Sequence, residues 1–415
     1  MKDKNFLLLV GSQLFSVLGT TIIQFVISLY VLDITQSALL FSIITALSIV
    51  GKLVCLPFCG ILADRLSKKR LMIMMDSLYV GFSVALLLAT RLENVLPMIG
   101  VLTVLMGMVS AFETPVVQSA IPLICQQEDI PKANGIISSI GMLGNIIGPV
   151  VAGMIYRFDA VYPIFLICGF LFVVAIGCEI ALYIPILPQK TGTQRVGEIV
   201  VGDLLEVVGY LKNELTIVKI GLVAFLLNLF ISSFIQVMIP FIARVQIGIN
   251  EEQFGLMNTF FALGSLVGTL LYSAFVNRLS NNSIFKGLIG MSLLFLGLTV
   301  PLGLMPSGLP AFWIMVALVT ILLGTVTLVS VQLIVYIQLI TKQALLGRVM
   351  SFIMIISTLA VPLGQLMYGV LGDQLGRNNL LILIIALTGI TLGISWYSRN
   401  IFQQMKTQLA QLKSE

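Results

Sequence analysis

Twelve apolar stretches, each long enough to cross a lipid bilayer, dominate this sequence of 415 residues. A membrane-spanning helix needs about 20 consecutive apolar residues, and only 10% of the residues here are charged. No stretch alternates in polarity at every second residue, which argues against a membrane β-barrel. The sequence therefore predicts an all-α integral membrane protein with twelve transmembrane helices, near residues 6–31, 38–62, 71–90, 95–119, 134–156, 160–184, 216–241, 253–276, 284–304, 311–338, 345–369 and 379–398.

The distribution of basic residues predicts the orientation of these helices. If the N-terminus is cytoplasmic, the cytoplasmic segments hold 18 of the 23 Lys and Arg residues, and the outer loops hold four. Such an excess marks the cytoplasmic side of a membrane protein. We therefore expect a multi-pass protein of the cell membrane with both termini in the cytoplasm. The net charge of +5 is a signal of topology and gives no reason to expect a nucleic-acid partner.

The residue types that carry most metal and enzyme chemistry are scarce. The chain has no histidine, and its five cysteines lie in or beside apolar stretches without the spacing of metal ligands. No phosphate-binding Gly-x-x-x-x-Gly-Lys-Ser/Thr loop is present, which disfavours an ATP-driven pump. We expect no metal, no cofactor and no enzymatic activity. Any group that carries a proton must be a carboxyl group or a lysine.

The chain also contains an internal repeat at a constant offset of 213 residues. The segment "GILADRLSKK" (60–69) aligns with "SAFVNRLSNN" (273–282), and the same offset places Pro149 on Pro362. Two six-helix halves are typical of secondary transporters. We expect an N-terminal bundle over 1–184, a cytoplasmic linker over 185–215 with an amphipathic helix at 197–214, a C-terminal bundle over 216–398 and a cytoplasmic tail over 399–415.

The segment at 60–69 resembles the loop motif Gly-x-Leu-Ala-Asp-Arg-x-Gly-Arg-Lys of the major facilitator superfamily. Gly60, Asp64, Arg65 and Lys69 are among the matching positions. The resemblance implies that this loop acts in gating. A carboxylate is stabilised at the positive end of a helix, so we expect Asp64 to cap a helix of the opposite half. The neighbouring basic residues can equally serve as topology anchors.

A second segment, "GIISSIGMLGNIIGPVVAG" (135–153), resembles the helix 5 motif of the drug–proton antiporters within that superfamily. The positions that match the motif are Gly135, Gly144, Gly148, Pro149 and Gly153. Small residues allow close helix contact, and we expect this contact between the two halves. The segment 111–135 resembles the macrolide- and siderophore-efflux branch. These resemblances imply export.

The charges inside the apolar stretches are the candidate proton-coupling groups. Lys52 lies about 12 Å from the cytoplasmic end of its helix, at a depth that roughly matches that of Glu113. Buried charges usually face a partner, so we expect Glu113 to carry the proton, with Lys52 as its counter-charge. A static ion pair, or a lysine that snorkels to the interface, is an equally good interpretation. Asp76 and Glu179 are secondary candidates, and Asp76 is expected to bond the loop bases.

The second half offers a neutral surface, since residues 287–341 include no charged residue. Four polar residues in the apolar stretches are candidates for lining a substrate cavity: Gln24, Asn228, Gln236 and Gln332. Each can equally bridge two helices by hydrogen bonds. An apolar cavity with a few neutral polar points suits a bulky, mostly apolar substrate.

The sequence thus predicts a secondary transporter, expected to be a monomer in the lipid membrane. It would export drug-like or macrolide-like apolar compounds in exchange for protons by alternating access. The alternative is a proton-coupled symporter or facilitator that imports a nutrient or lipid-like solute on the same fold, because fold does not determine function. A transporter-like sensor without solute flux is a third class.

Overall fold

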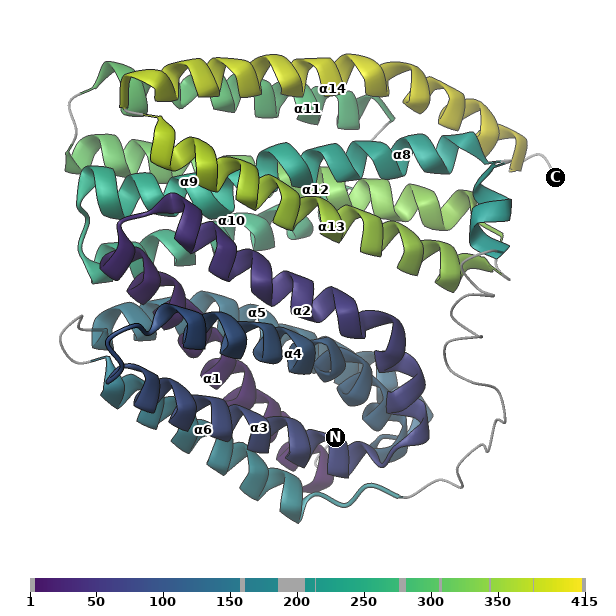
Figure 1. The fold of residues 1–415 in the computed structure, drawn as a ribbon. Helices are drawn as coiled ribbons and strands as arrows, with labels where there is room; N and C mark the ends of the chain where they lie inside the picture. Colours follow the sequence, from purple (N-terminus) through teal and green to yellow (C-terminus); the bar gives the residue numbers. More distant parts are fainter. Residues whose placement is uncertain are drawn as a thin grey trace. The chain divides into compact units, whose positions relative to one another are not determined.

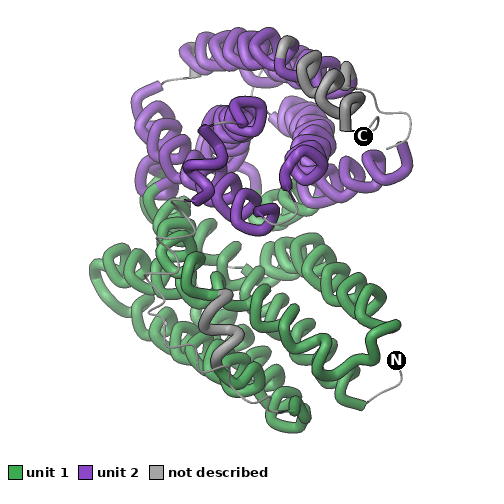
Figure 2. Tube along the Cα trace, turned by 90° about the vertical axis from the view of Figure 1, so that its right-hand side faces the viewer, with its two compact units in different colours: residues 1–36, 43–196, 250–259 green, residues 37–42, 197–249, 260–415 purple. Residues whose placement is uncertain are grey.

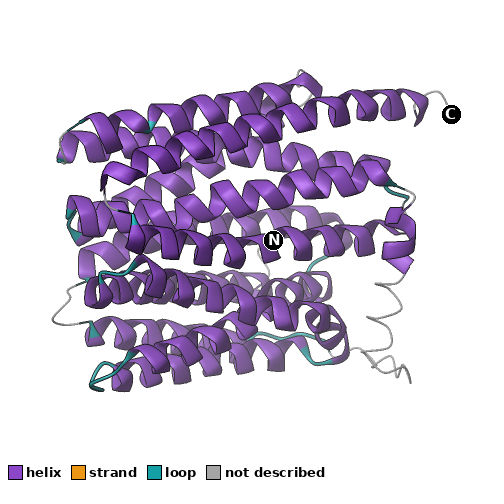
Figure 3. Ribbon diagram, turned by 45° about the horizontal axis from the view of Figure 1, so that its top comes forward, coloured by secondary structure: helices purple, strands orange, loops and turns teal. Residues whose placement is uncertain are grey.

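The computed structural model describes residues 4–156, 161–185, 206–212, 214–275, 281–305, 308–342, 345–375 and 377–412. Within these ranges, the side chains of 60–65 and 402–412, and those of Asn281, Asn282, Leu304, Arg377, Asn378 and Asn400, lie outside the description. Every regular element of the described part is a helix (Figure 3). The prediction of an all-α chain is confirmed.

The helices of the first half follow one another with short connections (Figure 1). They are α1 (Lys4–Thr35), α2 (Ala38–Arg65), α3 (Lys68–Ala89), α4 (Leu96–Ile124), η1 (Gln127–Asp129), α5 (Ile130–Ile155) and α6 (Tyr162–Ala181). The second half comprises α8 (Leu215–Leu226), η3 (Leu227–Ser232), α9 (Ser233–Phe241), η4 (Ile242–Ile247), α10 (Glu251–Phe275), α11 (Asn281–Gly297), η5 (Val300–Leu304), α12 (Leu309–Ile340), α13 (Leu346–Gln374) and α14 (Arg377–Leu412). Twelve helical stretches in the described residues are long and apolar enough to cross a membrane, as predicted.

The chain forms two compact units (Figure 2). Unit 1 comprises residues 1–36, 43–196 and 250–259, and unit 2 comprises 37–42, 197–249 and 260–415. In unit 1, α1 packs against α5 and α6, and α3 packs against α4 and α6. In unit 2, α13 packs against α8, η3 and α9, while α11 packs against α12 and α14. The first residues of α2 thus belong to unit 2, and the first residues of α10 belong to unit 1.

The internal repeat has a counterpart in the helix contacts. A Cβ atom at Gly51 of α2 would collide with the backbone carbonyl of Val104 in α4. A Cβ atom at Gly264 of α10, 213 residues further along, would collide in the same way with the carbonyl of Thr320 in α12. Glycine permits such contacts between helix backbones because it has no side chain. The two halves therefore repeat a helix contact as well as a sequence pattern.

The seventh span departs from the continuous α-helix that its sequence predicts. Residues 215–247 alternate between α-helix and π-helix, in the order α8, η3, α9 and η4. In η3, the carbonyl of Asn228 accepts a hydrogen bond from the Ser233 hydroxyl at 2.9 Å. Pro240 in α9 lacks a backbone N–H group, which removes one α-helical hydrogen bond just before η4 begins. These local hydrogen-bond changes have no signal in the pattern of apolar residues.

The linker and the C-terminal tail also differ from a simple loop and tail. Residues 206–212 are helical, with Val207 and Leu211 buried and Glu206 paired with Arg348 at the start of α13. The remainder of the predicted amphipathic helix, 197–205, Asn213 and Glu214, is either non-helical or outside the described residues. Helix α14 continues past the expected span end at 398 as far as Leu412.

Candidate functional site

Glu113 of α4, the expected proton carrier, has a tyrosine as its partner. The Tyr79 hydroxyl of α3 donates a hydrogen bond to Glu113 Oε1 at 2.8 Å. Tyr79 is fully buried, whereas Glu113 is half-buried. A hydroxyl can donate to either an ionised or a protonated carboxyl group. The bond therefore permits Glu113 to change its protonation state without losing its partner.

Packing between three helices holds the Tyr79 ring in place. The ring stacks on that of Phe172 in α6, with centroids 4.9 Å apart and planes 12° from parallel. Gly19 of α1 makes room for Phe172, because a Cβ atom there would lie 2.8 Å from Phe172 Cζ. The Phe82 ring meets Tyr79 edge-on at 5.9 Å. The hydroxyl of Tyr79 is thus directed at α4 by contacts on both sides of its ring.

A second group of polar side chains connects α1, α3 and α6. The Ser16 hydroxyl of α1 donates to Asp76 Oδ1 of α3 at 2.8 Å. The carboxyl group of Asp76 also approaches that of Glu179 in α6. Asp76 is 4% exposed and Glu179 is 1% exposed. The expectation that Asp76 bonds the basic residues of the preceding loop is wrong, since its hydrogen-bond partner Ser16 lies on α1 and its neighbour Glu179 lies on α6.

Lys52 of α2 is exposed, and among the described residues it forms no hydrogen bond or ion pair with Glu113. Its charge still acts on Glu113 over a longer distance. Close packing of α2 on α4 places it there, because Gly107 of α4 lies against the backbone of Ser48. The expected direct pair is therefore replaced in this structure by the bond from Tyr79. The proton-coupling role of Glu113, Lys52 and Asp76 stays a prediction.

In the loop motif at 60–69, the structure describes the side chains of residues 66–69 only. The side chains of Gly60, Asp64 and Arg65 lie outside the described residues, so the predicted capping role of Asp64 stays a prediction. Lys69 donates from Nζ to the backbone carbonyl of Ile180 at 2.7 Å. Ile180 lies in the last turn of α6. A cation is favoured at this end of a helix, so Lys69 connects the start of α3 to the end of α6.

A carboxylate cap of the expected kind occurs elsewhere in the chain, at the start of α2. Asp373, at the end of α13, accepts hydrogen bonds from the backbone N–H of Ala38 at 2.6 Å and from the Ser37 hydroxyl at 2.5 Å. The first N–H groups of a helix have no partner within the helix. Asp373 therefore supplies the acceptor that the first turn of α2 requires.

The helix 5 motif packs mainly within its own half. Gly144 and Gly148 of α5 face Val17 and Thr21 of α1, and a Cβ atom at Gly148 would lie 2.8 Å from Thr21 Cβ. This corrects the expectation that these two glycines contact the opposite half. A Cβ atom at Gly153 would lie 2.7 Å from the carbonyl oxygen of Glu251, at the start of α10. Those first residues of α10 belong to unit 1.

Two members of the helix 5 motif have other surroundings. A Cβ atom at Gly135 would meet nothing within 4 Å. Close packing therefore does not explain why this position of the helix 5 motif is a glycine. The carbonyl oxygen of Pro149 would lie 2.5 Å from a Cβ atom at Gly255 of α10. Thr259 of α10 also donates a hydrogen bond to the Ile146 carbonyl at 2.9 Å. The C-terminal part of the motif thus packs closely on α10 through backbone groups.

The four expected cavity residues divide into two kinds. Gln332 is buried and hydrogen-bonded to Ser283 of α11, so in this structure it bridges two helices, the alternative that its sequence left open. Gln24 and Gln236 are exposed, and Asn228 is half-buried with its amide bonded to the carbonyl of Ala224. Gln236 of α9 accepts a bond from Gln365 of α13 at 3.0 Å, so it also bridges two helices. Cavity lining stays a prediction for Gln24, Asn228 and Gln236.

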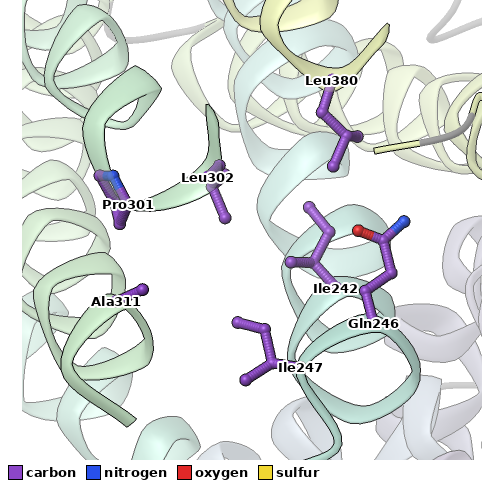
Figure 4. Close-up of a pocket in the computed structure, with 7 residues that line it drawn as sticks. All are labelled: Ile242, Gln246, Ile247, Pro301, Leu302, Ala311 and Leu380. Atoms are coloured by element: carbon purple, nitrogen blue, oxygen red, sulfur yellow. The ribbon is translucent and has the colours of Figure 1, made fainter. Parts of the chain in front are cut away.

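A small pocket in unit 2 contains none of these four residues (Figure 4). Its volume is about 20 Å³, and its lining residues are Ile242, Gln246, Ile247, Pro301, Leu302, Ala311 and Leu380. One water molecule occupies about this much space. The pocket is therefore too small for a drug-like ligand, and it lies beside the π-helical segments η4 and η5.

The similarity of the chain to known proteins agrees with this fold. The family model described as Major Facilitator Superfamily matches residues 9–365. The chain belongs to the Major Facilitator Superfamily. It is a membrane transporter of that superfamily, with twelve spans.

Curated relatives within the superfamily carry a common name. The chain is 26% identical over 375 residues to Macrolide efflux protein A of Streptococcus pyogenes, covering 90% of each chain. It is 26% identical over 310 residues to a protein of the same name from Enterococcus faecalis, covering 74% of this chain and 93% of that relative. The predicted resemblance to the superfamily and to its macrolide-efflux branch is confirmed.

Solved structures of other superfamily members have the same fold at low sequence identity. A bacterial homologue of the iron transporter ferroportin matches with a TM-score of 0.73 and 14% identity, covering 98% of this chain and 99% of that chain. A D-xylose–proton symporter matches with a TM-score of 0.69 and 13% identity, covering 95% and 97%. Identities this low show the fold that is shared and do not indicate what is transported.

Several site residues were not predicted for this superfamily member from its sequence. Tyr79, which bonds Glu113, Ser16, which bonds Asp76, and Asp373, which caps α2, belong to no recognisable sequence motif. One signal was present for Tyr79, which follows Asp76 by three residues and so lies on the same face of α3. The acidic residues Asp76, Glu113 and Glu179 all belong to unit 1.

Proposed function

We propose that this protein exports bulky apolar, macrolide-like compounds from the cytoplasm across the cell membrane in exchange for protons, by alternating access. The observation that carries this proposal is the similarity, over 90% of the chain, to a protein named Macrolide efflux protein A. The resemblance of residues 135–153 to the helix 5 motif of exporters supports the direction. The distribution of Lys and Arg supports an orientation with both termini in the cytoplasm.

Glu113 is the group that we propose to carry the coupling proton. In the present arrangement it is bonded to the Tyr79 hydroxyl, and Lys52 acts on it only from a distance. A nearby ammonium group favours the ionised form of a carboxyl group, and its withdrawal favours protonation. Movement of Lys52 toward Glu113 would therefore promote proton release, and movement away would promote proton binding. Tyr79 keeps the carboxyl group hydrogen-bonded meanwhile.

The substrate would meet mostly apolar surface with neutral polar groups. Residues 287–341 carry no charge, and the exposed amides of Gln24 and Gln236 can donate and accept hydrogen bonds. Such groups orient an apolar ligand at low desolvation cost, because no charge must be removed from water. This composition fits a macrolide-like ligand better than a sugar, which requires many hydrogen bonds.

Exchange in proteoliposomes tests the proposal directly. The purified chain is reconstituted with a pH-sensitive dye inside the vesicles, and erythromycin, a lipophilic cation or a siderophore is added under an imposed pH gradient. Proton movement opposite to one of these compounds is the expected result. Glu113→Gln should abolish it, because an amide cannot bind and release the proton.

Glu93→Gln is the matched control, since Glu93 is an exposed carboxyl group in the connection before α4. It should exchange protons at the wild-type rate. Protons that move together with the solute would instead establish a symporter, and solute flux without a proton response would establish a facilitator. Unchanged exchange in Glu113→Gln would assign the coupling proton to another residue.

A further inference from the structure

The contact between Asp76 of α3 and Glu179 of α6 is unusual because, among the residues that the structure describes, neither carboxyl group forms an ion pair with a cation. The two carboxyl groups approach each other where α3 packs against α6. Asp76 Oδ2 and Glu179 Oε2 are both buried and have no hydrogen-bond partner among the described residues. A carboxylate only accepts hydrogen bonds, so two ionised groups cannot bond each other. Two buried negative charges side by side, each with an oxygen that has no partner, would be costly, so the contact requires a proton between the groups.

The groups around the pair do not remove this requirement. Ser16 of α1 donates to Asp76, but a hydroxyl supplies no positive charge. Lys69, at the start of α3, donates to the carbonyl of Ile180 rather than to the pair. From α3 and α4, Tyr79 and Glu113 approach Asp76 closely enough for their charges to interact with it. Tyr79 is neutral and supplies no positive charge, and an ionised Glu113 disfavours a second negative charge in the pair.

We propose that Asp76 and Glu179 form a second proton-binding site, in which one proton is shared by the two carboxyl groups and exchanged during transport. Binding forms one O–H bond and leaves a single negative charge on the pair. Release breaks that bond and leaves two carboxylates that repel each other within the contact between α3 and α6. This state requires a new donor or a local separation of the helices. The exchange step rests on the proposed function, whereas the presence of the proton does not.

Infrared spectroscopy of the full chain in lipid tests whether the proton is present. A protonated carboxyl group has a C=O stretching band that shifts when hydrogen is replaced by deuterium. Asp76→Asn and Glu179→Gln each replace the shared proton by an amide N–H donor of the same shape, so each should remove one such band at neutral pH. Glu93→Gln is the matched control, because it removes an exposed carboxyl group in the connection before α4 and leaves the pair intact.

The outcomes separate the site from the transport mechanism. If the C=O band persists in both amide variants, the proposal of a shared proton is wrong. If the band of the wild-type protein weakens when NaCl replaces choline chloride, the pair binds sodium instead of a proton. With erythromycin as the probe, the number of protons moved per compound should fall at least twofold in both variants. An unchanged number overturns the exchange step. If the wild-type protein moves no protons, the proposed function fails, and the infrared band still decides whether the pair is protonated.

Discussion

Replacement of Asp373 tests how strongly one carboxylate holds the start of α2. Asp373 accepts hydrogen bonds from the Ala38 N–H and the Ser37 hydroxyl. Loss of a capping acceptor costs about 1 kcal/mol and up to about 2 kcal/mol, and a charge at a helix N-terminus contributes about 0.5 kcal/mol. Because Asp373 is exposed and screened by solvent, we expect Asp373→Ala to cost about 1–2 kcal/mol. Asp373→Asn keeps an acceptor and should cost about 0.5 kcal/mol.

Amide hydrogen exchange over residues 37–42 measures this cost locally. A loss of 1–2 kcal/mol corresponds to exchange that is about 5- to 30-fold faster for Asp373→Ala, and a loss of about 0.5 kcal/mol to about twofold for Asp373→Asn. Gln374→Ala is the matched control, since Gln374 is the exposed neighbour and takes no part in these two bonds. If Asp373→Ala exchanges at the wild-type rate, or no faster than the control, the cap does not stabilise α2 and the reasoning is wrong.

Two further substitutions test contacts of unit 1. Tyr79→Phe keeps the ring stack and removes the hydrogen-bond donor to Glu113. Loss of this donor costs about 1–3 kcal/mol, so proton-coupled efflux should fall fivefold or more. Unchanged efflux would show that the hydroxyl is dispensable. Gly107→Ala puts a Cβ atom against the Ser48 backbone and should destabilise the chain in detergent by about 1–3 kcal/mol. Gly81→Ala, with open space around it, should be neutral or stabilising, and equal melting midpoints for the two variants would contradict this account.

The number and extent of the spans could be predicted because a helix needs about 20 consecutive apolar residues to cross a bilayer. The sequence shows directly where such stretches occur. The partner of Glu113 could not, for a physical reason. Residue spacing gives the depth of Lys52 and Glu113 along their helices but not the rotation of each helix about its axis. The similar depths of Lys52 and Glu113 made a pair of these two residues plausible. The rotation of the helices about their axes instead places the hydroxyl of Tyr79 at Glu113.

The glycines of helix 5 illustrate a second limit of the sequence. Their spacing indicates a face that approaches another helix closely, and Gly144 and Gly148 do so. Spacing does not reveal which helix is approached, because that depends on the order in which the helices pack. Here the partner is α1, and only Gly153 meets α10. The π-helical segments were equally inaccessible, since they depend on individual bonds such as that from Ser233 to Asn228.

The concentration of intramembrane carboxyl groups in unit 1 has an electrical consequence. A membrane potential performs work of about 2.3 kcal/mol per 100 mV on an elementary charge that crosses the whole bilayer. Glu113, Asp76 and Glu179 lie in spans of unit 1, and residues 287–341 of unit 2 carry no charge. A proton that reaches these carboxyl groups crosses part of the voltage drop within unit 1. Voltage sensitivity would therefore reside in one half of the protein, and the uncharged stretch in the other half could change its ligand preference without altering the electrical work of a transport cycle.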